Sequence, residues 1–410
     1  MARCLYRSLA VAALIGAAWG QTIYTYIGQI SPRSVLIAWG TTQGKDNANT
    51  IGRSSKSLGL ATVQVGDRTV KTRKNWVEVK GLQPDTPFPY EVSIGAKRVG
   101  GGTVRTWPRS ADKLTFFVIG DYGNGSDGQR EVAAAMWDEF RKREAAGDPV
   151  RFVLTTGDNI YADEGGLAHS GSADADWEPK FFAPYRDLLQ QIPFLPSVGN
   201  HDGNASESRG DLPAYLDNFF FPGNRPVRWY EFHFGGLADF FALDSSENTT
   251  SGHPSPNYAP GGTESRWLKS ALAKSSAPWK IPYFHHPPFN AGPGHGASYD
   301  DLKHWVDQFQ RSGVKVAFSG HEHNFQFSED SDATRHIRFV VSGAGGELRP
   351  ASVQENMARA HIAGWAPARH FLVVEIAGRT MRITPISTEP VVVTDPGGKA
   401  VGMPLVVRLP

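Results

Sequence analysis

The pattern of apolar and polar positions changes once along the chain, at about residue 110. From Thr22 to about Pro108, short segments of alternating apolar and polar residues are separated by turn residues, and no helical period is present. The alternating segments predict β-strands at 24–30, 34–40, 60–66, 69–82 and 88–95. Together these strands predict a small all-β sandwich domain over residues 21–107, followed by a linker.

The second part of the chain contains unbroken apolar runs separated by helix-like stretches. Strands without polar alternation are buried on both faces, as in sheets that helices cover. The apolar runs predict buried strands at 114–120, 150–157, 238–244, 279–286, 314–320 and 337–343. Amphipathic stretches predict helices at 128–147, 263–276 and 299–313. We therefore predict a layered α/β domain over 114–388, a sheet sandwich flanked by helices that a hairpin at 371–388 completes; residues 389–410 stay unassigned.

Potential metal ligands stand at the ends of five apolar runs, and glycine introduces four of the five loops. The loops read GDYG (120–123), GDNIY (157–161), GNHD (199–202), HHP (285–287) and GHEH (320–323). In open α/β sheets the carboxyl ends of the strands are where ligands bind, and glycine lets the chain turn sharply there. A single loop of this kind is most often structural, but five in one domain indicate a shared metal centre. His321 and His323, which share a face if the strand continues, are then predicted ligands.

The composition limits the kind of metal site and the location of the protein. The single cysteine, Cys4, lies in an N-terminal segment (1–20) with the features of a secretory signal peptide, cleaved before Gln21. The mature chain would be secreted without thiolates, so histidine, carboxylate, amide and phenol groups must bind any metal. No other apolar run is long enough to cross a bilayer, so we expect no membrane span. The formal net charge of +1 gives no sign of nucleic-acid binding.

The five loops resemble those of the calcineurin-like metallophosphoesterase superfamily and, within it, those of the purple acid phosphatases. The superfamily often has Asp-x-His in the first loop, whereas Gly123 occupies the histidine position here. In the second loop Tyr161 follows Asp158 by three residues, and this exchange of histidine for tyrosine is typical of the purple branch. A phenolate is a hard anionic donor that stabilises Fe(III). The glycine-rich segment 343–350 resembles a family segment near the site, and 76–95 resembles part of a fibronectin type III-like domain, the N-terminal appendage of plant-type and many bacterial members.

The resemblance implies a role for each ligand position, and all seven positions hold the expected residue type. It implies three ligands for a ferric ion, three for a divalent ion (Zn, Fe or Mn) and one bridging carboxylate: Asp121, Tyr161 and His323; Asn200, His285 and His321; and Asp158. His285 is the ligand because the family pattern is His-x-Pro, and His286 is either a residue that supports the ligands or an ordinary loop histidine.

The activity that the resemblance implies is that of a secreted acid phosphatase. The two metals would supply hydroxide as the nucleophile and clamp the phosphate oxygens. His201 and His295 would be the catalytic residues: His201 would give the leaving alkoxide a proton, and His295 resembles the family's second substrate-facing histidine. A small phosphate monoester is the expected substrate, and a phosphodiester or a nucleotide is the alternative for the same site. A secreted binding protein with an inert metal domain is the remaining alternative, although no ligand is missing; the oligomeric state stays open.

Overall fold

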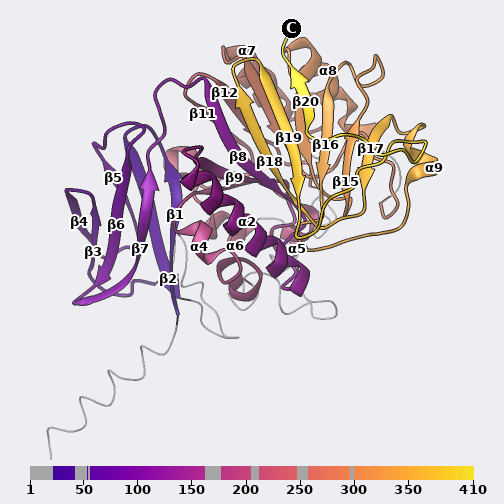
Figure 1. Cartoon of the computed structure of the whole chain (residues 1–410). Helices are drawn as coiled ribbons and strands as arrows, with labels where there is room; N and C mark the ends of the chain where they lie inside the picture. Colours follow the sequence, from indigo (N-terminus) through magenta and orange to yellow (C-terminus); the bar gives the residue numbers. More distant parts are fainter. Residues whose placement is uncertain are drawn as a thin grey trace, which may run out of the picture.

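The computed structural model describes residues 22–41, 53, 56–161, 177–204, 212–246, 257–295 and 300–410. The described residues form an α/β region of two large sheets, preceded by an all-β region (Figure 1). The predicted fold class is therefore confirmed. The predicted signal peptide lies outside the described residues, and none of the helices among them has the length and apolarity that a membrane span requires.

The N-terminal region consists of two antiparallel sheets, one with strand order β1-β2-β5 and one with order β4-β3-β6-β7. The strands are β1 (Ile23–Ile30), β2 (Ser34–Thr41), β3 (Ala61–Val65), β4 (Arg68–Thr72), β5 (Trp76–Lys80), β6 (Pro87–Ile94) and β7 (Lys97–Arg105). Every predicted strand segment overlaps at least one of them, but β7 was not predicted. Three glycines in β7 weaken its strand pattern. One of them is required by packing, since a Cβ atom at Gly100 would overlap the Thr25 side chain on β1.

The α/β region contains a six-stranded sheet with order β10-β9-β8-β18-β19-β20 and a seven-stranded sheet with order β11-β12-β13-β14-β16-β15-β17. The first sheet consists of β8 (Lys113–Ile119), β9 (Val150–Thr155), β10 (Phe194–Pro196), β18 (Phe371–Ala377), β19 (Thr380–Ile386) and β20 (Leu405–Arg408). The second consists of β11 (Tyr230–Phe234), β12 (Ala238–Ala242), β13 (Trp279–Tyr283), β14 (Val316–Ser319), β15 (Phe325–Ser328), β16 (Arg338–Ser342) and β17 (Ile362–Ala366). The predicted hairpin is β18–β19, and β20 from the unassigned tail pairs with β19.

Aromatic side chains fill the space between the two large sheets. Phe116 of the first sheet stacks on Phe152 at 5.2 Å between ring centroids and meets Phe240 of the second sheet edge-on at 5.4 Å. The next residue on β12, Phe241, packs instead in the core beneath the helices that cover the outer face of the second sheet. Strands buried on both faces explain why their sequences read as unbroken apolar runs.

The three predicted helices are present as α2 (Asp127–Ala145), α7 (Thr263–Lys274) and α8 (Lys303–Arg311). In Figure 1, α2 lies across the first sheet, and α7 and α8 lie on the far side of the second. Shorter helical elements are η2 (Glu178–Phe182), α4 (Arg186–Leu189), α5 (Asn200–Asn204), α6 (Pro213–Asn218), η3 (Pro222–Asn224), η4 (Asp300–Leu302) and α9 (Gln354–Met357). Within each sheet, β8, β9 and β10 are parallel neighbours, as are β12, β13, β14 and β16. Parallel pairing gathers the carboxyl ends of these strands at one edge of each sheet.

The N-terminal sheets pack directly against the α/β region. The Tyr24 hydroxyl on β1 donates a 2.7 Å hydrogen bond to Glu178, and the Tyr26 hydroxyl donates a 3.0 Å hydrogen bond to the carbonyl of Asn218. Both tyrosine rings lie against Phe182 of η2, at 5.7 and 5.5 Å between ring centroids. The aromatic contacts and paired hydroxyls indicate a fixed interface between the two regions.

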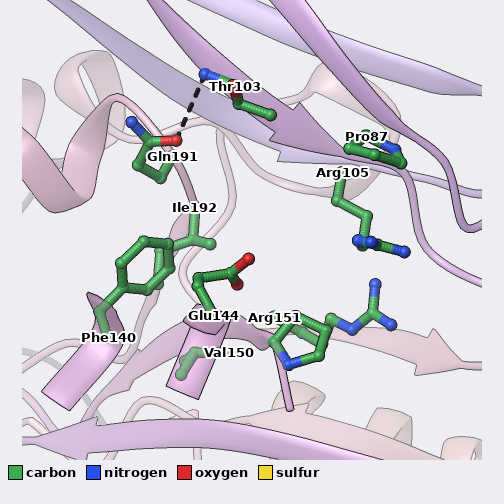
Figure 2. A pocket seen from close by; sticks show the side chains of 10 residues that line it. Pro87, Thr103, Arg105, Phe140, Glu144, Val150, Arg151, Gln191 and Ile192 are labelled. Carbon is green, nitrogen blue, oxygen red and sulfur yellow. Dashed lines mark hydrogen bonds between the residues drawn. The ribbon is translucent and has the colours of Figure 1, made fainter. Parts of the chain in front are cut away.

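A cavity of about 100 Å³ remains in this interface. Figure 2 shows Phe140 and Ile192 on one side of it, the guanidinium groups of Arg105 and Arg151 on the other, and the Glu144 carboxylate between them. Burial raises the pKa of Glu144, and the two arginines oppose this shift. The cavity lies at the start of β9, at the opposite end of that strand from its metal-ligand loop.

The buried His370 predicts a pH-dependent part of the folding free energy. Its Nδ1 donates to the carbonyl of Ala368 at 2.8 Å, and its Nε2 lies 3.2 Å from the Ser342 hydroxyl. Burial lowers the pKa of His370 from 6.5 to about 4. Between these values the unfolded chain binds a proton that the folded chain does not, so stability falls as the pH falls through this window, by up to about 3 kcal/mol.

We therefore expect the free energy of unfolding in urea to fall more steeply from about pH 7 to about pH 4.5 in the wild type than in His370→Gln. Comparing the two proteins removes the contribution of other titrating groups. The same pH dependence in both proteins would contradict this role of His370.

Candidate metal centre

All seven predicted ligands lie in one cluster at the carboxyl ends of β8, β9, β10, β13 and β14. Six of their side chains are buried, namely those of Asp121, Asp158, Tyr161, His285, His321 and His323. The seventh, Asn200, is partly buried and begins α5. The loops come from distant parts of the sequence, and the two sheets bring them together.

Three of the ligands converge on one point. The Tyr161 hydroxyl lies 3.3 Å from Asp121 Oδ1 and 3.2 Å from His323 Nε2. His323 Nε2 also lies 3.4 Å from Asp121 Oδ1. This group is the set predicted for the ferric ion.

A second group gathers next to the first. Asn200 Oδ1 lies 2.9 Å from His285 Nε2 and 3.1 Å from His321 Nδ1. The two imidazole nitrogens face each other at 3.0 Å. The Nδ1 of His285 donates to the carbonyl of Thr156 at 2.9 Å, which leaves the Nε2 lone pair directed into the group. This group is the set predicted for the divalent ion.

Asp158 lies between the two groups. Its Oδ1 accepts the backbone N–H of His201 at 2.8 Å, and its Oδ2 lies 3.3 Å from His285 Nε2. This Oδ2 is buried and has no hydrogen-bond partner among the described residues. Burial alone would raise the pKa of Asp158, but the His285 imidazole lowers it well below its ordinary value. A buried ionised carboxylate needs a positive charge beside it, which the protonated His285 imidazole or a bound metal ion would supply.

Burial shifts the pKa values of two neighbouring predicted ligands toward their neutral forms. Burial raises the pKa of Asp121, and the nearby Asp158 carboxylate adds to this shift. Burial is the main cause that raises the pKa of the Tyr161 phenol well above its ordinary value, and the Asp158 and Asp121 carboxylates add to the shift. Two buried carboxylates, a phenol and three imidazoles with converging donor atoms are a hard-to-borderline donor set. The described residues therefore fit two metal ions, one in each group.

Several ligands adopt a backbone conformation that costs free energy. Asp121, Asp158 and His321 have φ values of 56°, 48° and 70°, in the left-handed region that non-glycine residues seldom occupy. Such residues cluster at functional sites, where the surrounding structure maintains them. Here the His321 N–H donates to both carboxylate oxygens of Asp121, at 3.0 and 2.9 Å, and so ties two of these ligands together.

Gly123 packs too closely against the second loop to carry a side chain. A Cβ atom at Gly123 would overlap the backbone carbonyl of Asn159, so no side chain fits there. The N–H of Tyr161 donates to the Gly123 carbonyl at 2.8 Å. The second loop thus occupies the space beside the first, and its tyrosine supplies the oxygen that joins Asp121 and His323.

A sequence model of calcineurin-like phosphoesterases matches residues 114–325, just over half of the chain. The chain belongs to the calcineurin-like phosphoesterase family.

Several solved structures have folds similar to that of this chain. The chain resembles the structure of PhoD with a TM-score of 0.64 at 15% identity, over 93% of this chain and 92% of PhoD. It resembles purple acid phosphatase PPD1 from yellow lupin (Lupinus luteus) seeds with a TM-score of 0.67 at 14% identity, over 95% of this chain and 74% of that chain. For GAP50 of Plasmodium, the anchor in the inner membrane complex, the TM-score is 0.52 at 20% identity, over 73% and 89% of the two chains. These identities establish a shared fold, and no curated protein matches the sequence.

Both histidines predicted to be catalytic border the cluster of predicted ligands. The His201 ring lies 4.5 Å from the Tyr161 ring, and its backbone is held by Asp158. The His295 ring stacks on the His321 ring at 3.8 Å between centroids. The structure therefore places one histidine beside each group of ligands.

His286 and the glycine-rich segment 343–350 also border the centre. The His286 ring lies 4.3 Å from the His321 ring, and its Nδ1 is 3.1 Å from the Ser245 hydroxyl. In the glycine-rich segment, the N–H of Gly346 donates to the carbonyl of Asp121 at 3.0 Å. Both therefore contact residues of the metal centre, although neither supplies a predicted ligand.

Two acidic residues that the sequence analysis gave no role organise the loops. Asp202 accepts the N–H groups of Gly199 and Asn159, at 2.7 and 2.9 Å, and so joins the second and third ligand loops. Glu322, between the two histidines of the GHEH loop, accepts the N–H groups of Gly294 and His295 at 3.1 Å each. Their positions beside predicted ligands in GNHD and GHEH were a signal in the sequence, but most of the backbone groups that they bind belong to other loops.

A buried lysine supports the tyrosine ligand. Lys180 of η2 donates a 2.6 Å hydrogen bond to the carbonyl of Tyr161. The carbonyl of Lys180 in turn accepts the Gln129 side-chain amide at 2.5 Å. The Tyr161 backbone is thus held by η2, the same element that packs against the N-terminal sheets.

Proposed function

We propose that the protein is a secreted acid phosphatase that hydrolyses small phosphate monoesters with an Fe(III)–M(II) centre, where M is Zn, Fe or Mn. The observation that carries the proposal is the convergence of Tyr161 Oη with Asp121 and His323, at a place where Gly123 leaves no room for histidine. A phenol oxygen among hard donors favours Fe(III). The signal-like segment 1–20 supports secretion, and the N-terminal sheets would form the fibronectin type III-like appendage.

The chain would hold the ferric ion with Asp121, Tyr161 and His323, and the divalent ion with a second set: Asn200, His285 and His321. Asp158 would bridge the two. When bound, the two metals supply an ionised water at low pH and offset the negative charge that gathers on the phosphoryl oxygens during in-line displacement.

The side chains around the centre would orient the substrate and move protons. His201, whose backbone N–H donates to Asp158 Oδ1 at 2.8 Å, would give a proton to the leaving alkoxide. His295, stacked on His321, would contact the substrate from the other group of ligands. The left-handed ligand residues and the hydrogen bonds of Asp202 and Glu322 hold these groups in place before substrate binds.

The complete ligand set argues against an inert binding protein, so a simple assay tests the proposal. We expect 4-nitrophenyl phosphate to be hydrolysed with a kcat/KM at least about tenfold above that of bis(4-nitrophenyl) phosphate, with an optimum below neutral pH. The acidic optimum follows because the leaving-group histidine must be protonated. A preference for the diester would favour a phosphodiesterase instead. An optimum at about pH 9 would favour another metal pair.

A further inference from the structure

The cavity between the N-terminal sheets and the α/β region has groups of opposite charge in its wall. Arg105 and Arg151 present their guanidinium groups on one side, and the Glu144 carboxylate lies between them and the apolar side (Figure 2). In the part of the chain that the structure describes, no arginine or lysine lies within ion-pair distance of Glu144. Glu144 belongs to the last turn of α2, where the partial negative charge of the helix end also favours a cation. This carboxylate is therefore open to a positively charged ligand.

A single carboxylate holds both guanidinium groups in place. Asp85 Oδ1 lies 3.4 Å from Arg105 Nη1 and 2.9 Å from Arg151 Nη2, and the Asp85 carbonyl accepts a hydrogen bond from Arg105 Nη1 at 3.1 Å. Arg151 Nη1 is buried and has no hydrogen-bond partner among the described residues. Two guanidinium groups that share one carboxylate leave one positive charge in excess. Their planar donors suit a second carboxylate, which a ligand would supply.

The remaining wall of the cavity is apolar, and its rim reaches solvent. The Phe140 and Ile192 side chains are buried, whereas Thr103 and Glu144 are exposed. At the rim the Thr103 N–H donates to the side-chain carbonyl of Gln191 at 3.3 Å, a hydrogen bond between the two regions (Figure 2). Small-molecule sites are typically concave and apolar with a few polar groups, and they occur preferentially between domains.

A ligand with a single charge would match only one part of this wall. An anion bound to the two arginines would lie near the Glu144 carboxylate, which repels it, and a cation bound to Glu144 would lie near the excess positive charge. A molecule with both a carboxylate and an ammonium group meets each part with the opposite charge. The cavity of about 100 Å³ also requires a small molecule, since a cavity of about 150 Å³ is filled by benzene.

We propose that this cavity binds a small zwitterion, an α-amino acid with a short apolar side chain. Its carboxylate would accept hydrogen bonds from Arg105 and Arg151, and its ammonium group would donate to Glu144. Its side chain would pack toward Phe140 and Ile192. The ligand would thus join β7, which carries Arg105, to α2, which carries Glu144. The cavity lies at the start of β9, away from the metal centre, so the inference does not depend on the proposed function.

Three probes of similar size test the inference by calorimetry on the full chain at about pH 7. L-Alanine carries both charges, propionate carries only the carboxylate, and ethylammonium carries only the ammonium group. We expect L-alanine to bind at least about tenfold more tightly than either of the other two, as one further charged hydrogen bond implies.

Two substitutions separate the ends of the ligand. Glu144→Gln should weaken L-alanine binding by about tenfold or more and change propionate binding by less than about threefold. Arg105→Gln should weaken the binding of both, because both carry the carboxylate. Glu144 is exposed and Arg105 is partly exposed, and Arg105→Gln leaves the contact between Arg151 and Asp85 in place, so both variants should fold.

Glu131→Gln is the matched control, because Glu131 is an exposed glutamate of the same helix that does not line the cavity. It should bind all three probes as the wild type does. A wild type that does not bind L-alanine, propionate that binds as tightly as L-alanine, or L-alanine binding that Glu144→Gln leaves unchanged would each overturn the inference. A wild type that hydrolyses no phosphate ester, but whose L-alanine binding depends on Glu144 and Arg105, would refute the proposed function and leave this site standing.

Discussion

Asp158→Asn is expected to lose both metal ions and to lower kcat for 4-nitrophenyl phosphate by more than about a hundredfold. Losing a residue that only orients a metal ligand typically costs 10–100-fold in affinity or activity. Asp158 is the predicted bridge, and its buried Oδ2 has no hydrogen-bond partner among the described residues. Removing its charge should therefore affect both ions at once.

Comparing asparagine with alanine at this position separates charge from backbone strain. Asp158 has a φ of 48°, a conformation that asparagine tolerates and alanine does not. Asp158→Ala should lose the metals as well and should also be less stable, by about 1 kcal/mol. The exposed Asp187 on α4 provides a control, since Asp187→Ala should keep metals and activity. Two metals and full activity in Asp158→Asn would contradict the bridging role.

Tyr161→Phe is expected to abolish a visible absorption band. A phenolate bound to Fe(III) gives ligand-to-metal charge transfer, so the oxidised wild type should be purple or pink. Burial and two carboxylates raise the pKa of Tyr161, so the phenol would ionise only with a cation bound to it. The phenylalanine ring keeps the packing, and the backbone bonds of Tyr161 to Gly123 and Lys180 do not involve the phenol. Activity should fall but need not vanish, because Asp158 stays in place.

Tyr185→Phe is the matched control for this experiment. Tyr185 is a buried tyrosine whose hydroxyl has no hydrogen-bond partner among the described residues. Its loss should leave both the band and the fold unchanged. The spectra are compared at equal iron content. An unchanged band in Tyr161→Phe would exclude this residue as the ligand.

The sequence was sufficient to predict the fold class, and the five loops that it marks as candidate metal ligands lie together in the structure. Strands buried between a second sheet and helices produce unbroken apolar runs, and their ends are marked by glycines followed by ligand residues. A Cβ atom at Gly199 would overlap Asp158, and one at Gly320 would overlap Asp121. This close packing explains why glycine precedes the predicted ligands Asn200 and His321. At such positions, the glycine that marks the turn in the sequence is also the residue that the neighbouring loop leaves room for.

The parts that the sequence did not predict depend on contacts between distant segments. Strand β7 forms because its glycines allow packing on β1, although they weaken its strand pattern. Asp202 and Glu322 act on backbone groups of other loops, and nothing in their own surroundings in the sequence shows those partners. Such contacts become visible only when the sheets place the loops side by side.

Metal analysis of the purified, oxidised protein tests the central claim most directly. We predict close to two metal ions per chain, at least one of them iron, because two groups of donor atoms converge on either side of Asp158. Removing the metals with a chelator should abolish hydrolysis of 4-nitrophenyl phosphate, and adding iron with zinc should restore it. Protein that hydrolyses this ester with fewer than two metals per chain, or without iron, would contradict the account.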